Sequence, residues 1–291
     1  QSGGSFYLTA STAGQTLIEP VAVPYAAGQT IRDALRGSGY AFGGIDTAFI
    51  TDIEGVAGNF TVYYDGGAYS LDAIASPETV TAVVFSERER GFPALLDAVT
   101  ELARFRERTD HVQNYPAAQQ AYAAALSGLR TADEAGLTTL LATLRSAVAE
   151  YEAILNGPKY TLTVAASQNG QTLTQPTVTL TDAYGNETTG TGTEIRVVAG
   201  EYRFSVSDGG WNRTEGTVTV TEDRTLTVQL PAGEWFGDIN ILDAEKKPFD
   251  RTQDASAHTV QFLLPDTATT YGLYLNAMIG DVPDRETTRL R

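Results

Sequence analysis

The chain has 291 residues and a net charge of −16, from 36 acidic and 20 basic side chains. The acidic excess is spread along the sequence, which offers no concentrated basic face of the kind that binds nucleic acid or an anionic membrane. Cysteine is absent, which excludes disulfides, thiolate nucleophiles and cysteine-ligated metal sites. No apolar run approaches the roughly 18 residues of a transmembrane helix. At this length we expect about two to four domains.

Residues 6–90 are predicted to form a first domain, in which two strands precede a short helix and further strands follow it. Apolar and polar residues alternate along these strands, as on a sheet with one buried face. The strands are expected at residues 6–10, 17–23, 48–53, 60–64 and 80–85. The helix runs through Ile31 and Leu35, with Thr30 and Asp33 as a capping pair at its start. One helix packed on a mixed sheet gives the domain its core.

Four stretches of this first domain, spread over about eighty residues, resemble a known family. They are GQTIRDAL at 28–35, FITDIEG at 49–55, VYYDGG at 62–67 and VTAVVF at 80–85. In order and spacing they resemble the β-grasp domain found at the C-terminus of transcobalamin and repeated in many bacterial surface proteins. The resemblance implies a β-grasp fold and names a cobamide as one ligand to consider. This chain has Tyr63 and Tyr64 where a tryptophan is common in that family.

Three tyrosines of this domain are the candidate ligand-binding residues. Tyr63 and Tyr64 lie on a predicted strand, and Tyr69 lies in the turn after it. Together they could form an aromatic platform for a sugar or a peptide. The alternative is that they serve as core and cross-strand packing on a half-buried strand.

Residues 91–157 have apolar positions at spacings of three and four, which predicts three amphipathic helices. Asn114 can cap the second helix, and Pro116 suits its first turn. Thr131 and Glu134 form a capping box for the third helix. Because none of the helices can bury its apolar stripe alone, we expect an antiparallel three-helix bundle.

The apolar spacing returns to two after the helices. Residues 158–232 alternate apolar side chains with threonines, which predicts a β-sandwich module. Asn169 and Gly170 supply one of its tight turns. Residues 233–291 repeat the pattern in part and are expected to form a second, incomplete β module.

Further resemblances cover these segments. Residues 115–155 resemble the small helical modules called FIVAR, which recur in large surface proteins of Gram-positive bacteria. The stretch AGEYRFSV at 199–206, with Gly210 and Trp211 after it, resembles PEGA and carboxypeptidase-regulatory modules. The stretch TDAYGN at 181–186 resembles a strand-end turn of bacterial immunoglobulin-like repeats. All of these imply an extracellular setting, and they leave the sandwich topology open.

No catalytic signature is present in the sequence. The two histidines, His111 near a helix end and His258 in a polar loop, are far apart and lack metal-ligand spacing. No nucleophile motif accompanies them. We therefore expect a protein that is not an enzyme, with no catalytic residues, no metal and no cofactor.

These features predict a secreted or cell-surface protein of a bacterium, of multidomain α+β class. Its modules are expected to serve in adhesion or in binding an extracellular glycan, peptide or cobamide, without nucleic acid or membrane insertion. Residues 2–5 are expected to be a flexible leader on a fragment whose export signal has been removed. Two alternatives stay open: a purely structural stalk, and an accessory region of a larger extracellular enzyme.

Overall fold

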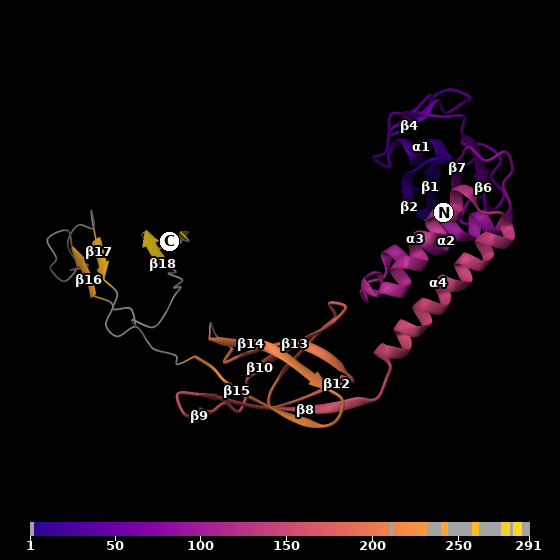
Figure 1. The fold of residues 1–291 in the computed structure, drawn as a ribbon. Coiled ribbons are helices and arrows are strands. Elements are labelled where there is room, and N and C mark those ends of the chain that lie inside the picture. The colour runs from indigo at the N-terminus through magenta and orange to yellow at the C-terminus, as the bar shows by residue number, and fades with distance from the viewer. Residues whose placement is uncertain are drawn as a thin grey trace. The chain divides into compact units, whose positions relative to one another are not determined.

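The computed structural model describes residues 3–209 and 212–231 in full, together with the backbone of four later strands at 240–243, 258–261, 275–279 and 282–286. Residues Gln1–Leu230 form one compact unit and Pro231–Arg291 a second, and each is treated by itself below. The first unit is of α+β class. An N-terminal mixed sheet is followed by central helices and then by further sheets (Figure 1).

The N-terminal sheet has the strand order β2-β1-β7-β6. Strand β1 (Gly4–Ser11) pairs antiparallel with β2 (Thr16–Tyr25) and parallel with β7 (Ala82–Ser86), which pairs antiparallel with β6 (Thr61–Tyr64). Strand β1 therefore already includes Gly4 and Ser5, which the sequence had assigned to a flexible leader. Between β2 and β6 lies the short helix α1 (Ile31–Arg36), whose capping box of Thr30 and Asp33 is confirmed.

The predicted strand at 48–53 is largely wrong. Only β4 (Asp52–Ile53) forms there, between β3 (Phe42–Gly43) and β5 (Val56–Ala57). Residues 44–50 form a loop instead, because Gly44 has a positive φ of 72° and the hydroxyl of Thr47 donates to the carbonyls of Gly44 and Phe49, each at 2.9 Å. Such side-chain bonds compete with the ladder of a strand.

Four helical elements follow. They are α2 (Pro93–Glu107), the 3₁₀ turn η1 (Val112–Asn114), α3 (Pro116–Thr131) and α4 (Glu134–Leu155). Pro116 occupies the first turn of α3, as predicted, but the Asn114 side chain does not cap that helix. Its Nδ2 instead donates to the carbonyl of Tyr184 at 2.7 Å.

The predicted capping box of α4 is also wrong. Thr131 is the last residue of α3, and Ala132 is extended between the two helices. The cap of α4 is Asp133, whose carboxylate accepts a hydrogen bond from the backbone N–H of Gly136 at 2.7 Å. Aspartate is as good a cap as threonine, and because α3 continues through Thr131, the start of α4 moves to Asp133.

Strand β7 is buried on both faces. One face contributes Val83 and Phe85 to a core shared with α1, and the other contributes Ala82 and Val84 to a core shared with the helices. Leu102 of α2 is among the fully buried members of that second core. The N-terminal sheet and the helices thus meet through β7, rather than only through the chain that links them.

Two further sheets complete the first unit and enclose one core, to which Leu162, Val164, Val178 and Val206 contribute. One sheet has the order β11-β10-β13-β14 and the other β12-β8-β15, with β9 paired to β8. All pairs are antiparallel except β8 with β15. The strands are β8 (Lys159–Gln168), β9 (Gln171–Thr172), β10 (Thr177–Asp182), β11 (Glu187–Thr191), β12 (Glu194–Val198), β13 (Gly200–Ser207), β14 (Arg213–Val220) and β15 (Arg224–Gln229). The predicted turn at Asn169 and Gly170 joins β8 to β9, both residues having positive φ.

In the second unit, β16 (Asn240–Asp243) pairs with β17 (His258–Gln261), and β18 (Leu275–Ile279) pairs with β19 (Val282–Glu286). His258 therefore begins a strand, and its assignment to a loop was wrong. Gly210 and Trp211, which carry part of the resemblance to PEGA modules, lie outside the described residues.

Candidate functional site

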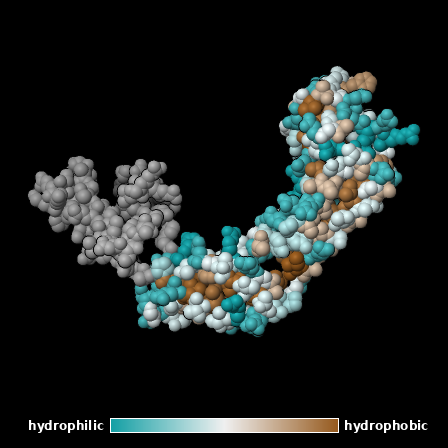
Figure 2. All heavy atoms as spheres, viewed as in Figure 1, coloured by the Kyte–Doolittle hydropathy of each residue, from teal (hydrophilic) through white to brown (hydrophobic). Residues whose placement is uncertain are grey.

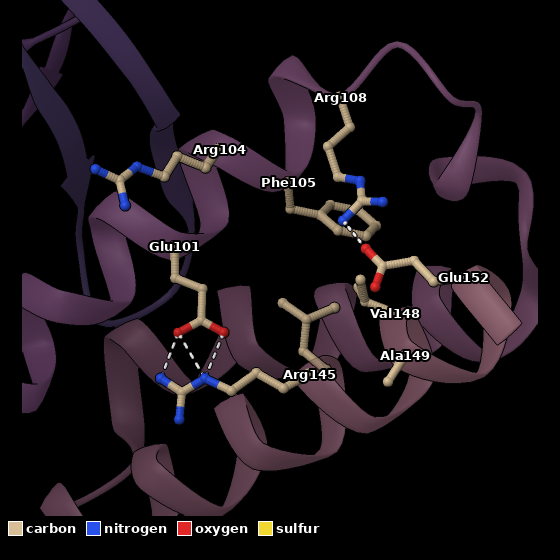
Figure 3. Close-up of a pocket in the computed structure, with 9 residues that line it drawn as sticks. Glu101, Arg104, Phe105, Arg108, Arg145, Val148, Ala149 and Glu152 are labelled. Atoms are coloured by element: carbon tan, nitrogen blue, oxygen red, sulfur yellow. Dashed lines mark hydrogen bonds and ion pairs between the residues drawn. The ribbon is translucent and has the colours of Figure 1, made fainter.

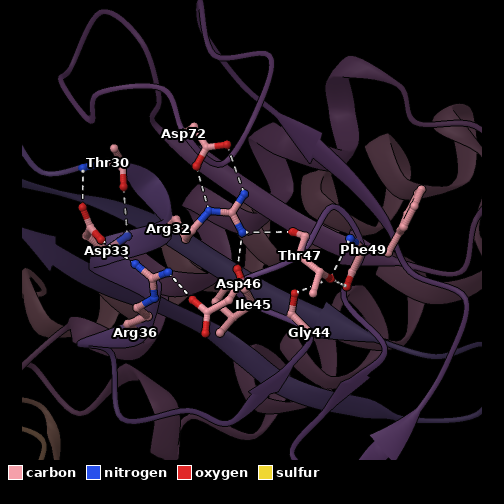
Figure 4. Close-up of polar contacts among 10 residues, drawn as sticks. All are labelled: Thr30, Arg32, Asp33, Arg36, Gly44, Ile45, Asp46, Thr47, Phe49 and Asp72. Carbon is pink, nitrogen blue, oxygen red and sulfur yellow. Dashed lines mark hydrogen bonds and ion pairs between the residues drawn. The ribbon is translucent and has the colours of Figure 1, made fainter.

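The candidate site is a pair of loops beside helix α1, residues 44–50 and 67–75, which we call the aromatic loops. Arg32 of α1 joins them (Figure 4). Its guanidinium donates two hydrogen bonds to the carboxylate of Asp72, at 2.7 and 3.1 Å, and others to the carbonyls of Ile45 and Thr47, the latter at 3.2 Å. The bond from Arg32 also lowers the pKa of Asp72. One side chain that is 15% exposed therefore fixes both loops.

A second arginine strengthens the first loop. Arg36, in the last turn of α1, forms ion pairs with Asp33 at 2.7 Å and with Asp46. Both arginines come from α1, which is itself held by its capping box and by the burial of Ile31 and Leu35. The loops are thus attached to a packed element of the fold, and a binding surface on them would need little ordering when a ligand arrives.

The aromatic loops expose three large apolar side chains. Phe49 is 78% exposed, Tyr69 87% and Ile74 45%. Within the described residues a fourth, Ile154 on α4, is 37% exposed. On the face shown in Figure 2, hydrophobic residues also gather over the C-terminal sheets of the first unit. Aromatic side chains held in water on fixed loops are typical of interaction sites.

The structure does not bring the three predicted tyrosines together. Tyr63 packs toward the helices and its hydroxyl donates to the carbonyl of Arg88 at 2.6 Å, whereas Tyr64 packs on the opposite face of the sheet, toward α1. Burial raises the pKa of Tyr64 to about 12. Tyr69 alone is well exposed. Phe49 was missed because its stretch was taken for a strand.

A groove between α2 and α4 is the main competing site (Figure 3). Its volume is about 370 Å³, and Phe105, Leu144 and Val148 form part of its lining. Ion pairs bridge it on either side: Glu101 with Arg145, at 2.9 Å, and Arg108 with Glu152, at 2.8 Å. These ion pairs stabilise the contact between the helices. The groove offers a ligand no exposed ring, because Phe105, the one aromatic residue of its lining, is only 6% exposed.

His111 does not help to build a metal site in the part of the chain whose side chains are described, and the side chain of His258 lies outside that part. His111 has a positive φ of 59° at the start of η1, and no cluster of three or more possible ligands occurs among residues 3–209 and 212–231. No helix of these ranges is both long and apolar enough to cross a membrane.

No protein-family model matches this chain, and no curated protein matches it. Any functional assignment therefore rests on the geometry described above.

Proposed function

We propose that this chain belongs to an exported, non-catalytic bacterial surface protein and binds an extracellular ligand through the aromatic loops. The observation that carries the proposal is the exposure of Phe49 and Tyr69 on loops that Arg32 holds to the fold. The proposal takes the N-terminal sheet with α1 as a β-grasp domain, the helices as a three-helix bundle and the C-terminal sheets as a β-sandwich. Parallel pairing of β1 with β7 beside one helix supports the first of these.

The ligand we favour is a glycan or an extended peptide. Phe49 and Tyr69 offer apolar ring faces, and Asp46 and Asp72 lie three residues outside them in the sequence. The two aspartates are 73% and 68% exposed, so the lone pairs that Arg36 and Arg32 leave unused can accept hydrogen bonds from hydroxyl or amide groups. Sugars and peptides both present apolar faces flanked by such donors. A cobamide, which the family resemblance suggests, stays a third candidate.

Replacing Phe49 or Tyr69 with alanine is expected to weaken ligand binding by about tenfold each, because loss of one buried aromatic contact costs on the order of 1.4 kcal/mol or more. The measurement is screening of the whole chain on glycan and peptide arrays and by cobalamin titration, followed by calorimetry with any ligand found. Ile154→Ala is the matched control, since Ile154 is an exposed apolar residue away from the loops. Equal losses in all three variants, or no binding to any probe, would count against the proposal.

A second candidate function, a structural spacer, is favoured by the contacts between the helices and the C-terminal sheets. The hydroxyl of Tyr151, a fully buried residue of α4, donates to the carbonyl of Asp110 and accepts a hydrogen bond from Nδ2 of Asn186 at 2.7 Å. The ring of Tyr184 lies edge-on to those of Tyr151 and Tyr115, with centroids 5.3 and 5.7 Å apart.

The turn that makes these contacts is itself well ordered. Oδ1 of Asp182 accepts hydrogen bonds from the backbone N–H groups of Tyr184 and Asn186, both at 2.8 Å. Side-chain acceptance of this kind fixes a turn before it meets a partner. The junction thus joins helices and sheets by a specific contact, as a spacer of defined geometry requires.

The double variant Tyr184→Ala, Asn186→Ala is expected to speed proteolysis in the link at 156–158 by about tenfold, because the junction then opens more often. Limited proteolysis of the whole chain measures the rate, and calorimetry shows whether one melting transition becomes two. Glu187→Ala is the control, since this neighbouring residue is exposed. An unchanged cleavage rate would show that the junction does not hold these parts together.

A further inference from the structure

Both β regions of the first unit place their first strand beside their last strand, and in parallel. In the N-terminal sheet, β1 pairs with β7 over five residue pairs, from Tyr7 with Ala82 to Ser11 with Ser86. In the C-terminal sheets, β8 pairs with β15 over six pairs, from Leu162 with Arg224 to Ser167 with Gln229. These are the parallel pairings among the strands of residues 3–231.

This arrangement determines how each region responds to a force applied to its two ends. In a parallel pair, the start of the first strand and the end of the last strand lie at opposite ends of the ladder. Tension on the two ends therefore acts along the strands and strains all the hydrogen bonds of the ladder at once. In an antiparallel pair pulled open from its free end, the bonds break one after another.

Burial protects the N-terminal ladder, and an additional hydrogen bond extends the C-terminal one. All five residues of β7 are buried, and Leu8, Thr9, Ala10 and Ser11 of β1 are buried beside them. Water is thus kept from competing for the hydrogen bonds of the N-terminal ladder. In the C-terminal region the backbone N–H of Leu230 extends the ladder, donating to the carbonyl of Ser167 at 2.8 Å.

We propose that residues 4–230 carry mechanical tension, with the β1–β7 and β8–β15 ladders as the load-bearing contacts. Simultaneous rupture of all the hydrogen bonds of a ladder sets a high barrier to unfolding under force, and forced unfolding depends on that barrier. The inference is independent of ligand binding by the aromatic loops. It suits a surface protein held at one end and pulled at the other.

The direction of pulling provides the test. Because the chain lacks cysteine, pairs of introduced cysteines give unique attachment points for handles in single-molecule force spectroscopy of the whole chain. Lys159→Cys with Gln229→Cys loads the β8–β15 ladder along its strands. Glu201→Cys with Thr219→Cys opens β13 from β14 at the free end of their antiparallel pairing. All four residues are exposed.

A matching comparison tests the N-terminal sheet. Ser5→Cys with Glu89→Cys loads the β1–β7 ladder, and Ser5→Cys with Pro24→Cys opens β1 from β2 at their free end. Pulling along each parallel ladder is expected to need at least about twice the unfolding force of the matched opening geometry at one loading rate. Equal forces in the two geometries of either sheet, in variants that keep the parent melting temperature, would overturn the proposal for that sheet.

Discussion

Replacement of Arg88 with methionine is expected to lower the free energy of unfolding by about 3 kcal/mol, since each hydrogen bond from a charged group contributes about 1.5–3 kcal/mol before the cost of its burial. Nε of Arg88 donates to the carbonyl of Leu129 at 2.8 Å, and Nη2 donates to those of Gly128 and Ala132, at 2.9 and 2.7 Å. These carbonyls lie at the end of α3, where helix carbonyls run out of backbone partners. That of Gly128 also accepts a hydrogen bond from the backbone N–H of Ala132, at 3.0 Å.

Two further interactions of Arg88 are also expected to stabilise the fold. Its positive charge lies at the negative end of the α3 dipole, and its guanidinium lies 5.3 Å from the ring centroid of Phe92. Burial lowers the pKa of Arg88, yet arginine remains charged at any pH at which the protein is folded. The side chain therefore joins the segment after β7 to the end of α3.

The experiment is urea unfolding followed by circular dichroism. Arg88→Lys is expected to recover only part of the loss, because one ammonium group cannot match the planar fork of a guanidinium. Arg90→Met is the control, since Arg90 is exposed two residues away and its loss is expected to cost less than about 0.5 kcal/mol. If Arg88→Met were no more destabilised than Arg90→Met, the cap on α3 would contribute nothing.

Replacement of Gly44 with alanine is expected to lower the free energy of unfolding by about 3 kcal/mol. About 1 kcal/mol of this reflects the positive φ of Gly44, and the rest reflects a steric overlap. The φ of Gly44 is 72°, and a Cβ atom there would overlap the carbonyl oxygen of Phe49. That carbonyl belongs to the backbone and cannot move aside as a side chain can. The loop must therefore open, and the variant is also expected to lose ligand binding at Phe49.

Gly39→Ala separates the two contributions. Gly39 also has a positive φ, 86°, but a Cβ atom there would meet nothing within 4 Å. The free energy of unfolding of Gly39→Ala is expected to fall by only about 1 kcal/mol in the same urea measurement. Equal losses of unfolding free energy in the two variants would mean that the close approach of Gly44 to the carbonyl of Phe49 does not affect stability.

Local signals in the sequence predicted the local structure well. The capping box of α1 and the first-turn proline of α3 depend on residues within four positions of one another, and the structure has both. The α4 cap was misplaced because Thr131 and Asp133 were both acceptable caps, and Thr131 belongs to the last turn of α3. Two-sided burial of β7 could have been inferred from the unbroken apolar run at 82–85, which is typical of a strand covered on both faces.

The candidate site was harder to predict, for a different reason. Arg32 contacts residues 13, 15 and 40 positions away, and no periodicity in the sequence records such partners. The alternation of strand side chains, in contrast, already implied that Tyr63 and Tyr64 face opposite ways. Phe49 could have been found only by recognising that Gly44 and Thr47 turn the chain back before a strand can form.

The double burial of β7 also bears on how the protein is made. Once residue 86 has left the ribosome the N-terminal sheet can close, but one of its faces stays uncovered until α2 and its neighbours follow. A nascent chain that exposes an apolar face is prone to aggregate with other chains. Helices form in about a microsecond once their residues are free. Encoding them directly after the sheet keeps that vulnerable period of synthesis short.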